Sequence, residues 1–369
     1  MSDYIKPFPN INDPIDGHIH IHKWFDENKN INFLHGLEEY REACGLKYIT
    51  LAPLPSGNAI PVSRDVSNNI ICAFYKIANK NTFSYGGFTY PSYPVSKDEM
   101  EEKDMSLLTQ YKELMEIGFD GIKMLEGKPN LYIKIGKELD GDLFEPVFEK
   151  MEKDGTYILM HALDPECFWT EPTEERIKKK WYYGDGTYPT IKELYSQIDN
   201  VLEKHPRLNL CLAHFFFSSS NPQRLEAMFE KYKNLSIDIT PGGEMYIDFD
   251  KRPEYFHNFF KKYDDRIIFG TDMDFPVYLE AGKWLCDREY RFLATKETLK
   301  SFDDHTLTGI EIPNESLQKI FSANLLKKFN GKPREINKEA LKRYIEKYDH
   351  LILDRELSKL INELSKIYL

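Results

Sequence analysis

The chain has 369 residues, 41% of them hydrophobic and 14% aromatic, so it is long enough to bury one large core. Its formal charge of −11 argues against a nucleic-acid-binding surface, because such surfaces neutralise phosphates with lysine and arginine. The sequence has no apolar run near the roughly 20 residues that span a bilayer, no signal-peptide core in MSDYIKPFPN and only five scattered cysteines, which predicts a cytoplasmic protein with reduced thiols.

The first informative segment is DGHIHIH at residues 16–22, within a strand expected over about 15–22. Residues two apart on a strand point to one face, so the aspartate and the three histidines share a face and the isoleucines occupy the other. Neutral imidazole is the commonest protein ligand for zinc and related metals. We therefore expect His18 and His20 to bind a metal ion, and His22 to have a rim or substrate-contacting role. The alternatives are a polar edge strand, or histidines bonded to backbone carbonyls.

Strand and helix patterns then alternate along the chain. The further strands are expected at 47–53, 82–90, 121–125, 157–161, 208–214, 235–240 and 267–272. The helices between them are expected at 33–45, 63–80, 99–118, 144–154, 191–205, 222–232 and 253–263. Eight apolar runs separated by helices imply parallel strands with helical crossovers. We predict an α/β fold of the (β/α)8, or TIM-barrel, type; the alternative, an open doubly wound sheet, would normally carry a glycine-rich phosphate turn that GHIHIHK does not provide.

Two segments, residues 164–189 and the chain from 314 onward, are expected outside this alternation, and one rim loop within it is singled out. Residues 164–189 form a long, charged and aromatic insertion, which is typical of a lid, a binding loop or a disordered segment. Its lysines at 178–180 are more simply a solvated helical face than an anion site. PGGEMY at 241–246 is expected as a rim loop. The chain from 314 onward is helical, and we divide the protein into a barrel domain, 1–330, and a C-terminal helical extension, 331–369, packed on the barrel or on the partner subunit of a homodimer.

Polar residues end several of the predicted strands. The active site of a (β/α)8 barrel lies at the carboxyl ends of the strands. The candidates at those ends are His18, His20, Lys123, His161, His214 and Asp272. A single histidine at a strand end is usually structural, but four histidines and an aspartate on one rim are hard to ascribe to chance. Catalytic zinc typically has three protein ligands and an open position for water, which a set of His18, His20, His161 and Asp272 can provide.

These residues and their order resemble the amidohydrolase superfamily, specifically amidohydrolase family 2, a family of metal-dependent hydrolases of TIM-barrel fold. The resemblance runs in order over about residues 15–330, and residues after about 333 lie outside it. The matching pieces are DGHIH, GIK at 121–123, His161, HPRLNLCLAHFF, NLSIDITPGGEMY, IIFGTDMDFP and IPNESLQKIFSANLLKKF.

The resemblance implies a divalent metal held by His18 and His20, with His161 and Asp272 completing the site. In mononuclear members the strand-six histidine, here His214, orients water or polarises the substrate carbonyl. In binuclear members His161 and His214 bind a second metal, and a carboxylated strand-four lysine, here Lys123, bridges the two. Lys123 can instead be an ammonium that binds a substrate carboxylate, or a lysine without a special role. We favour one ion over two, and zinc over manganese or iron.

The expected chemistry follows from a metal-bound water, whose pKa falls from about 15.7 to about 7. Asp272 would take its proton as general base and pass it to the leaving group. The expected function is hydrolysis of an amide, lactone or ester of a small, cyclic or aromatic molecule. The alternative is non-oxidative decarboxylation of a carboxylated aromatic acid, whose carboxylate Lys123, Arg64 or Arg176 would anchor. A phosphoesterase or nuclease, and a scaffold with a structural metal, fit the ligand pattern less well.

A metal-binding imidazole usually needs an acceptor for its second nitrogen. The sequence offers four acidic candidates for this role: Asp16, Asp238, Asp274 and Glu244.

Overall fold

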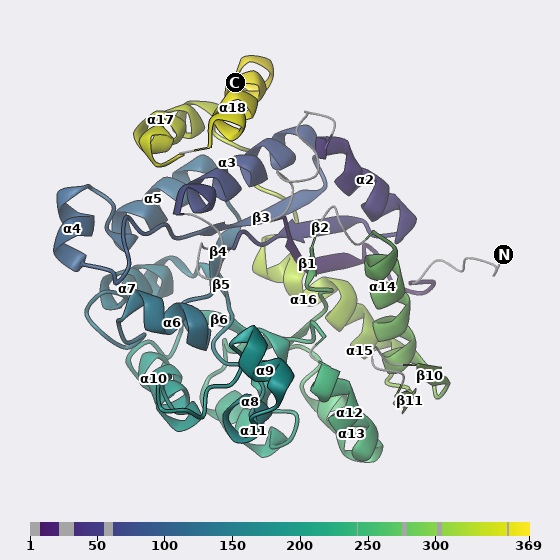
Figure 1. Ribbon diagram of the computed structural model, residues 1–369. Coiled ribbons are helices and arrows are strands. Elements are labelled where there is room, and N and C mark those ends of the chain that lie inside the picture. The colour runs from purple at the N-terminus through teal and green to yellow at the C-terminus, as the bar shows by residue number, and fades with distance from the viewer. Residues whose placement is uncertain are drawn as a thin grey trace.

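The computed structural model describes residues 8–21, 33–54, 62–241, 243–274, 279–300, 305–352 and 354–369. Its centre is a sheet of parallel strands in the spatial order β8-β7-β6-β5-β4-β3-β2-β1-β9. The strands are β1 (Ile15–His20), β2 (Tyr48–Leu51), β3 (Thr82–Gly87), β4 (Gly121–Met124), β5 (Tyr157–Met160), β6 (Asn209–Leu212), β7 (Ser236–Asp238), β8 (Ile267–Ile268) and β9 (Met273–Asp274). Helices surround these strands (Figure 1), which confirms the predicted (β/α)8 barrel.

The barrel closes through one interrupted strand. β8 pairs with β7 and β9 pairs with β1, so the segment 267–274 acts as the eighth strand in two halves. Between the halves, Gly17 N donates to Phe269 O at 3.1 Å, and Asp272 N donates to His18 O at 2.9 Å. The predicted strand at 267–272 is therefore split. Asp272 causes the break, because its φ of +55° lies outside the strand region.

The outer helices match the predicted pattern with shifts of a few residues. They are α2 (Phe33–Ala43), α3 (Val62–Ala78), α5 (Leu107–Ile117), α7 (Glu145–Asp154), α10 (Ile191–Lys204), α11 (Pro222–Lys231) and α13 (Pro253–Lys262). A further outer helix, α14 (Leu279–Ala294), follows β9. Their local signals are plain in α10. Thr190 and Glu193 form a capping box at its start, and Leu194, Ile198 and Val201 are buried at helical spacing on the face toward the core.

Several elements differ from the sequence prediction. The helix expected at 99–118 is two helices, α4 (Lys97–Glu102) and α5, because Asp104 has a φ of +53° and Ser106 caps α5 by accepting from Thr109 N. The stretch expected as a rim loop at 241–246 contains the start of α12 (Gly243–Lys251). Elements that the prediction missed include α6 (Pro129–Ile135), α14, β10 (Thr298–Lys300) and β11 (Thr306–Thr308).

Aromatic residues fill the end of the barrel where the strands begin. Phe329, just after α16 (Asn324–Lys328), stacks on Phe83 with ring centroids 4.8 Å apart and meets Tyr85 and Tyr157 edge-on. These rings belong to a buried cluster that includes Ile15, the first residue of β1. The cluster seals one end of the barrel, which leaves the carboxyl ends of the strands as the open end.

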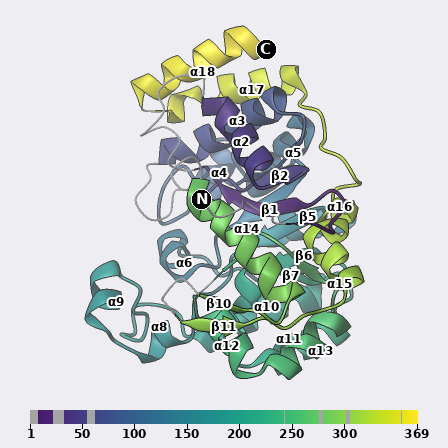
Figure 2. The same ribbon diagram turned by 90° about the vertical axis from the view of Figure 1, so that its right-hand side faces the viewer.

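The C-terminal helices pack on the barrel's own outer helices. α17 (Lys338–Tyr348) contacts α5 and α3, and α18 (Arg355–Tyr368) contacts α3 (Figure 2). Tyr348 Oη donates to Glu113 at 2.9 Å. Gly118 allows the segment just before α17 to pass close by, because a Cβ at Gly118 would lie 2.3 Å from the carbonyl oxygen of Glu335. Its φ of +109° also favours glycine. The division into domains at residue 330 stays a prediction.

Among the described residues, no helix combines the length and apolar character that crossing a membrane would require.

Candidate metal centre

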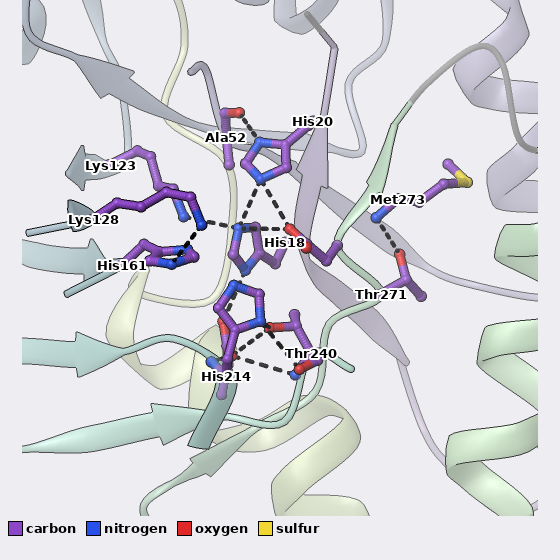
Figure 3. A network of polar contacts seen from close by, with 12 residues as sticks. His18, His20, Ala52, Lys123, Lys128, His161, His214, Thr240, Thr271 and Met273 are labelled. Carbon is purple, nitrogen blue, oxygen red and sulfur yellow. Dashed lines mark hydrogen bonds and ion pairs between the residues drawn. The ribbon is translucent and has the colours of Figure 1, made fainter. Parts of the chain in front are cut away.

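The two histidines of β1 point their Nε2 atoms at the same place. His18 Nδ1 lies 2.8 Å from Asp238 Oδ2, and His20 Nδ1 lies 2.7 Å from the carbonyl oxygen of Ala52 (Figure 3). A carbonyl oxygen and a carboxylate can only accept, so we assign the ring protons to both Nδ1 atoms. Both Nε2 atoms then present lone pairs, and they are 3.1 Å apart. This is the tautomer that metal-binding histidines adopt.

Asp272 and Lys123 complete the cluster. Asp272 Oδ1 lies 3.0 Å from His20 Nε2 and 3.5 Å from His18 Nε2, and the ligand atoms of these three residues all lie within 4.8 Å of one another. Lys123 Nζ lies 2.9 Å from His18 Nε2. Two imidazole lone pairs and a carboxylate at such distances repel one another unless a cation lies between them. The donor set therefore fits a divalent metal ion, with nitrogen and oxygen ligands that suit zinc, manganese or iron.

Burial lowers the pKa of two basic side chains in the cluster, His18 and Lys123. Burial, with the nearby Lys123, lowers the pKa of His18 to about 3, which keeps its imidazole neutral. Burial also lowers the pKa of Lys123 to about 8. Burial opposes ionisation of Asp238, but hydrogen bonds, first that of His18 and then that of Thr240, outweigh it and lower the pKa of that carboxyl to about 2. Asp238 is therefore an ionised acceptor behind His18.

The backbone at His214 and Asp272 is left-handed. His214 begins a run to Phe217 with φ between +47° and +56°, and Asp272 has a φ of +55°. Such residues cost on the order of 1–3 kcal/mol each and persist only where their surroundings hold them. Here His214 N donates to Asp238 Oδ1 at 2.7 Å, and Asp272 N donates to His18 O at 2.9 Å. Hydrogen bonds to Asp238 and to the backbone of His18 thus hold both left-handed residues in place.

His214 lies beside the cluster with one nitrogen turned away from it. Its Nδ1 lies 2.9 Å from Thr240 Oγ1, which donates to Asp238 Oδ1 at 2.7 Å. The centroid of its ring is 5.8 Å from that of His18 and 4.7 Å from that of His161. Asp238 therefore holds His18 directly and His214 through Thr240.

His161 lies on the same rim but its Nε2 faces other partners. That atom is 3.3 Å from Lys128 Nζ and 3.3 Å from Asp164 Oδ1. It is not among the three ligand atoms that gather around His18, His20 and Asp272. The structure thus brings three of the four expected ligands together and places the fourth beside them.

A sequence model of the amidohydrolase family, described as "Amidohydrolase", matches residues 101–324, which is more than half of the chain. The chain belongs to this amidohydrolase family. The expected family membership is confirmed, and the grouping of His18, His20 and Asp272 agrees with the metal dependence of amidohydrolases.

Solved structures of similar fold extend the comparison. A 2,6-dihydroxybenzoate decarboxylase from Rhizobium has 15% sequence identity and a TM-score of 0.53, covering 87% of this chain and 99% of the other. A 5-carboxyvanillate decarboxylase from Novosphingobium aromaticivorans, complexed with manganese, has 12% identity and a TM-score of 0.53, covering 89% and 99%. A putative amidohydrolase from Staphylococcus aureus has 14% identity and a TM-score of 0.52, covering 86% and 98%. No curated protein matches the sequence. At these identities the likeness shows the shared barrel fold.

The remaining sequence candidates lie in different parts of the structure. Among the proposed acceptors, Asp238 serves His18, whereas Asp16 accepts from Tyr40 Oη and Thr271 Oγ1 and ties β1 to the turn before Asp272. Glu244 lies half-buried on α12. His22 and the side chains of Asp274 and Arg64 lie outside the described residues.

Sequence reasoning missed the acceptor of His20, because the carbonyl of Ala52 carries no signature of residue type. It also missed Lys128 and Asp164. Their signal was available, because each follows within four residues of the end of a strand, β4 and β5 respectively.

Proposed function

We propose that this amidohydrolase-family chain is a metal-dependent hydrolase that cleaves an amide, lactone or ester bond of a small molecule. The observation that supports the proposal is the convergence of His18 Nε2, His20 Nε2 and Asp272 Oδ1 at the open end of the barrel. We propose a single ion, zinc before manganese or iron. The manganese in the Novosphingobium decarboxylase is a reason to test manganese alongside zinc.

The residues of the chain have distinct roles in this mechanism. A bound divalent ion would supply Lewis acidity and lower the pKa of a water to about 7. Asp272, whose side chain is 33% exposed, would take up a proton from the attacking water and return it to the leaving group. His214, whose Nδ1–H donates to Thr240 Oγ1, has an unprotonated Nε2 that can accept a hydrogen bond from the attacking water and so orient it. Asp238 keeps His18 in the tautomer that leaves Nε2 unprotonated.

Decarboxylation of a carboxylated aromatic acid is the second candidate, and the position of Lys123 favours it. Its Nζ is buried 2.9 Å from His18 Nε2, and it forms no ion pair within the part of the chain that the structure describes. A substrate carboxylate could compensate this charge. Arg176 is a poorer anchor than expected, because it bonds to Glu171 and to the carbonyl of Cys167 within the insertion.

The two reactions differ in their products. The metal-loaded protein is incubated in ¹⁸O-labelled water with a panel of lactones, esters and amides, and separately with 2,6-dihydroxybenzoate and 5-carboxyvanillate. Label in the product without carbon dioxide supports hydrolysis, whereas carbon dioxide without label supports decarboxylation. Asp272→Asn should abolish the turnover, and Asp287→Asn, on the exterior helix α14, should leave it unchanged. Full activity after chelation of all metal would refute both candidates.

A further inference from the structure

The insertion between β5 and α10 folds around one tyrosine. It contains α8 (Cys167–Thr170) and α9 (Glu174–Lys179), which project from the side of the barrel in Figure 2. Tyr183 is 1% exposed, and its ring centroid lies 5.9 Å from that of Phe168, 5.0 Å from that of Trp169 and 4.6 Å from that of Tyr188. Its backbone N–H donates to Phe168 O at 2.7 Å. Tyr183 is therefore the residue on which the aromatic packing of the insertion converges.

The hydroxyl of Tyr183 leaves this aromatic cluster and reaches the rim of the barrel. It donates to Asp164 Oδ2 at 2.7 Å. The other carboxylate oxygen, Asp164 Oδ1, accepts from Lys128 Nζ at 2.6 Å and lies 3.3 Å from His161 Nε2. Lys128 Nζ in turn lies 3.3 Å from His161 Nε2 (Figure 3). A continuous set of polar contacts thus runs from the insertion to His161, the residue that follows β5.

Both oxygens of Asp164 are needed to keep this set in place. Asp164 is 3% exposed, so water does not readily replace a lost partner. With Tyr183 on one oxygen and Lys128 on the other, the carboxylate has one orientation in which both donors are satisfied. That orientation places Oδ1 3.3 Å from His161 Nε2.

We propose that Tyr183 is a positioning residue that couples the folding of the insertion to the orientation of His161 and Lys128. When the insertion is closed, its hydroxyl fixes Asp164, and Asp164 fixes the lysine and the histidine at the rim. When the insertion opens, that constraint is lost and His161 is free to turn. The inference rests on the proposed function only in treating the rim around His161 as part of the catalytic site.

The test needs neither metal nor substrate, so failure of the proposed function would leave it standing. Tyr183→Phe removes the hydroxyl and keeps the ring. Tyr188→Phe is the matched control, because it removes a hydroxyl from the ring next to Tyr183. The hydrogen bonds to Asp164 come from Tyr183 and Lys128, not from the hydroxyl of Tyr188. Ring ¹H–¹³C spectra of histidine-labelled, metal-free protein are recorded at one pH, with the His161 cross-peak assigned from His161→Gln.

Tyr183→Phe should shift or broaden the His161 cross-peak and reduce amide hydrogen-exchange protection over 164–189 by about tenfold or more. Tyr188→Phe should leave the cross-peak in place, and in both variants the distant His257, bonded to Ile310 O, should be unchanged. A folded Tyr183→Phe whose His161 cross-peak matches the wild type would overturn the inference. If that variant does not fold, Asp164→Asn decides: the His161 cross-peak should move, and an unmoved cross-peak would equally overturn the inference.

Discussion

Asp238→Asn should weaken metal binding more than its small change in shape suggests. Asp238 Oδ2 accepts from His18 Nδ1 at 2.8 Å, while Oδ1 accepts from His214 N at 2.7 Å and from Thr240 Oγ1 at 2.7 Å. Asparagine has the same shape but one oxygen and one NH2 group. In either orientation of the amide, its NH2 meets at least one N–H donor. The variant therefore leaves either the ring of His18 or the backbone of His214 without an acceptor.

The size of the effect follows from the loss of that acceptor. Removing a partner that orients a metal-binding histidine typically lowers metal affinity by about 10–100-fold, or about 1.4–2.7 kcal/mol. A buried donor without an acceptor costs about 1–3 kcal/mol of folding stability as well. Asp238 is almost fully buried, so neither effect is relieved by solvent. We expect a zinc dissociation constant at least tenfold above that of the wild type.

The assay is a competition titration of zinc against a chromophoric chelator at fixed pH, with urea unfolding of the metal-free proteins in parallel. Asp199→Asn is the control, because Asp199 pairs with Arg224 on the outside of the barrel and is partly exposed. A wild-type zinc affinity in Asp238→Asn would refute the reasoning, since the tautomer of His18 would then not depend on this carboxylate. Equal losses in both variants would show that the effect is not specific to the site.

Three further predictions concern stability. Burial lowers the pKa of His18 from 6.5 to about 3, so between these pH values the unfolded chain binds a proton that the folded chain does not. The free energy of unfolding of the metal-free protein should therefore fall by up to about 1.4 kcal/mol per pH unit as pH falls. In His18→Asn, the free energy of unfolding measured in urea should depend less steeply on pH. Gly155→Ala, at φ +69° with nothing within 4 Å of the added Cβ, should lower the free energy of unfolding by about 1–2 kcal/mol. Gly118→Ala should lower it more and expose the C-terminal helices to protease, because its methyl group meets a carbonyl oxygen. Equal losses in the two variants would contradict this. Phe329→Ala should cost about 3–5 kcal/mol in thermal unfolding and leave zinc affinity unchanged, since the ring lies at the opposite end of the barrel; a matching fall in affinity would count against that separation.

The sequence was sufficient for the parts of the structure that depend on local patterns. Alternating strand and helix signals predicted the barrel, because each strand is a short apolar run and each helix has an apolar face. The spacing of two residues between His18 and His20 predicted that both lie on one face of β1, and their Nε2 atoms do converge. The end of the strand at 267–272 predicted the place of Asp272 on the same rim.

Features that depend on contacts between distant segments could not be predicted in this way. The acceptor of His20 is a backbone carbonyl, and the partners of His161 come from two different loops. The left-handed turn that begins at His214 has no glycine to mark it. The helix expected at 99–118 was divided by a single aspartate with positive φ, which an apolar pattern does not reveal.

If the chain binds a metal ion as proposed, the divided eighth strand links metal binding to synthesis as far as residue 274. β1 is made first and carries two of the proposed ligands, but the third, Asp272, lies in the segment 267–274, whose second half pairs with β1. A nascent chain that still lacks this segment has no way to assemble the triad, however well its earlier strands have paired. Tight binding of an ion would therefore begin only when β9 has paired with β1 and closed the barrel. The bound ion would stabilise the closed barrel over forms in which β1 and β9 are separated.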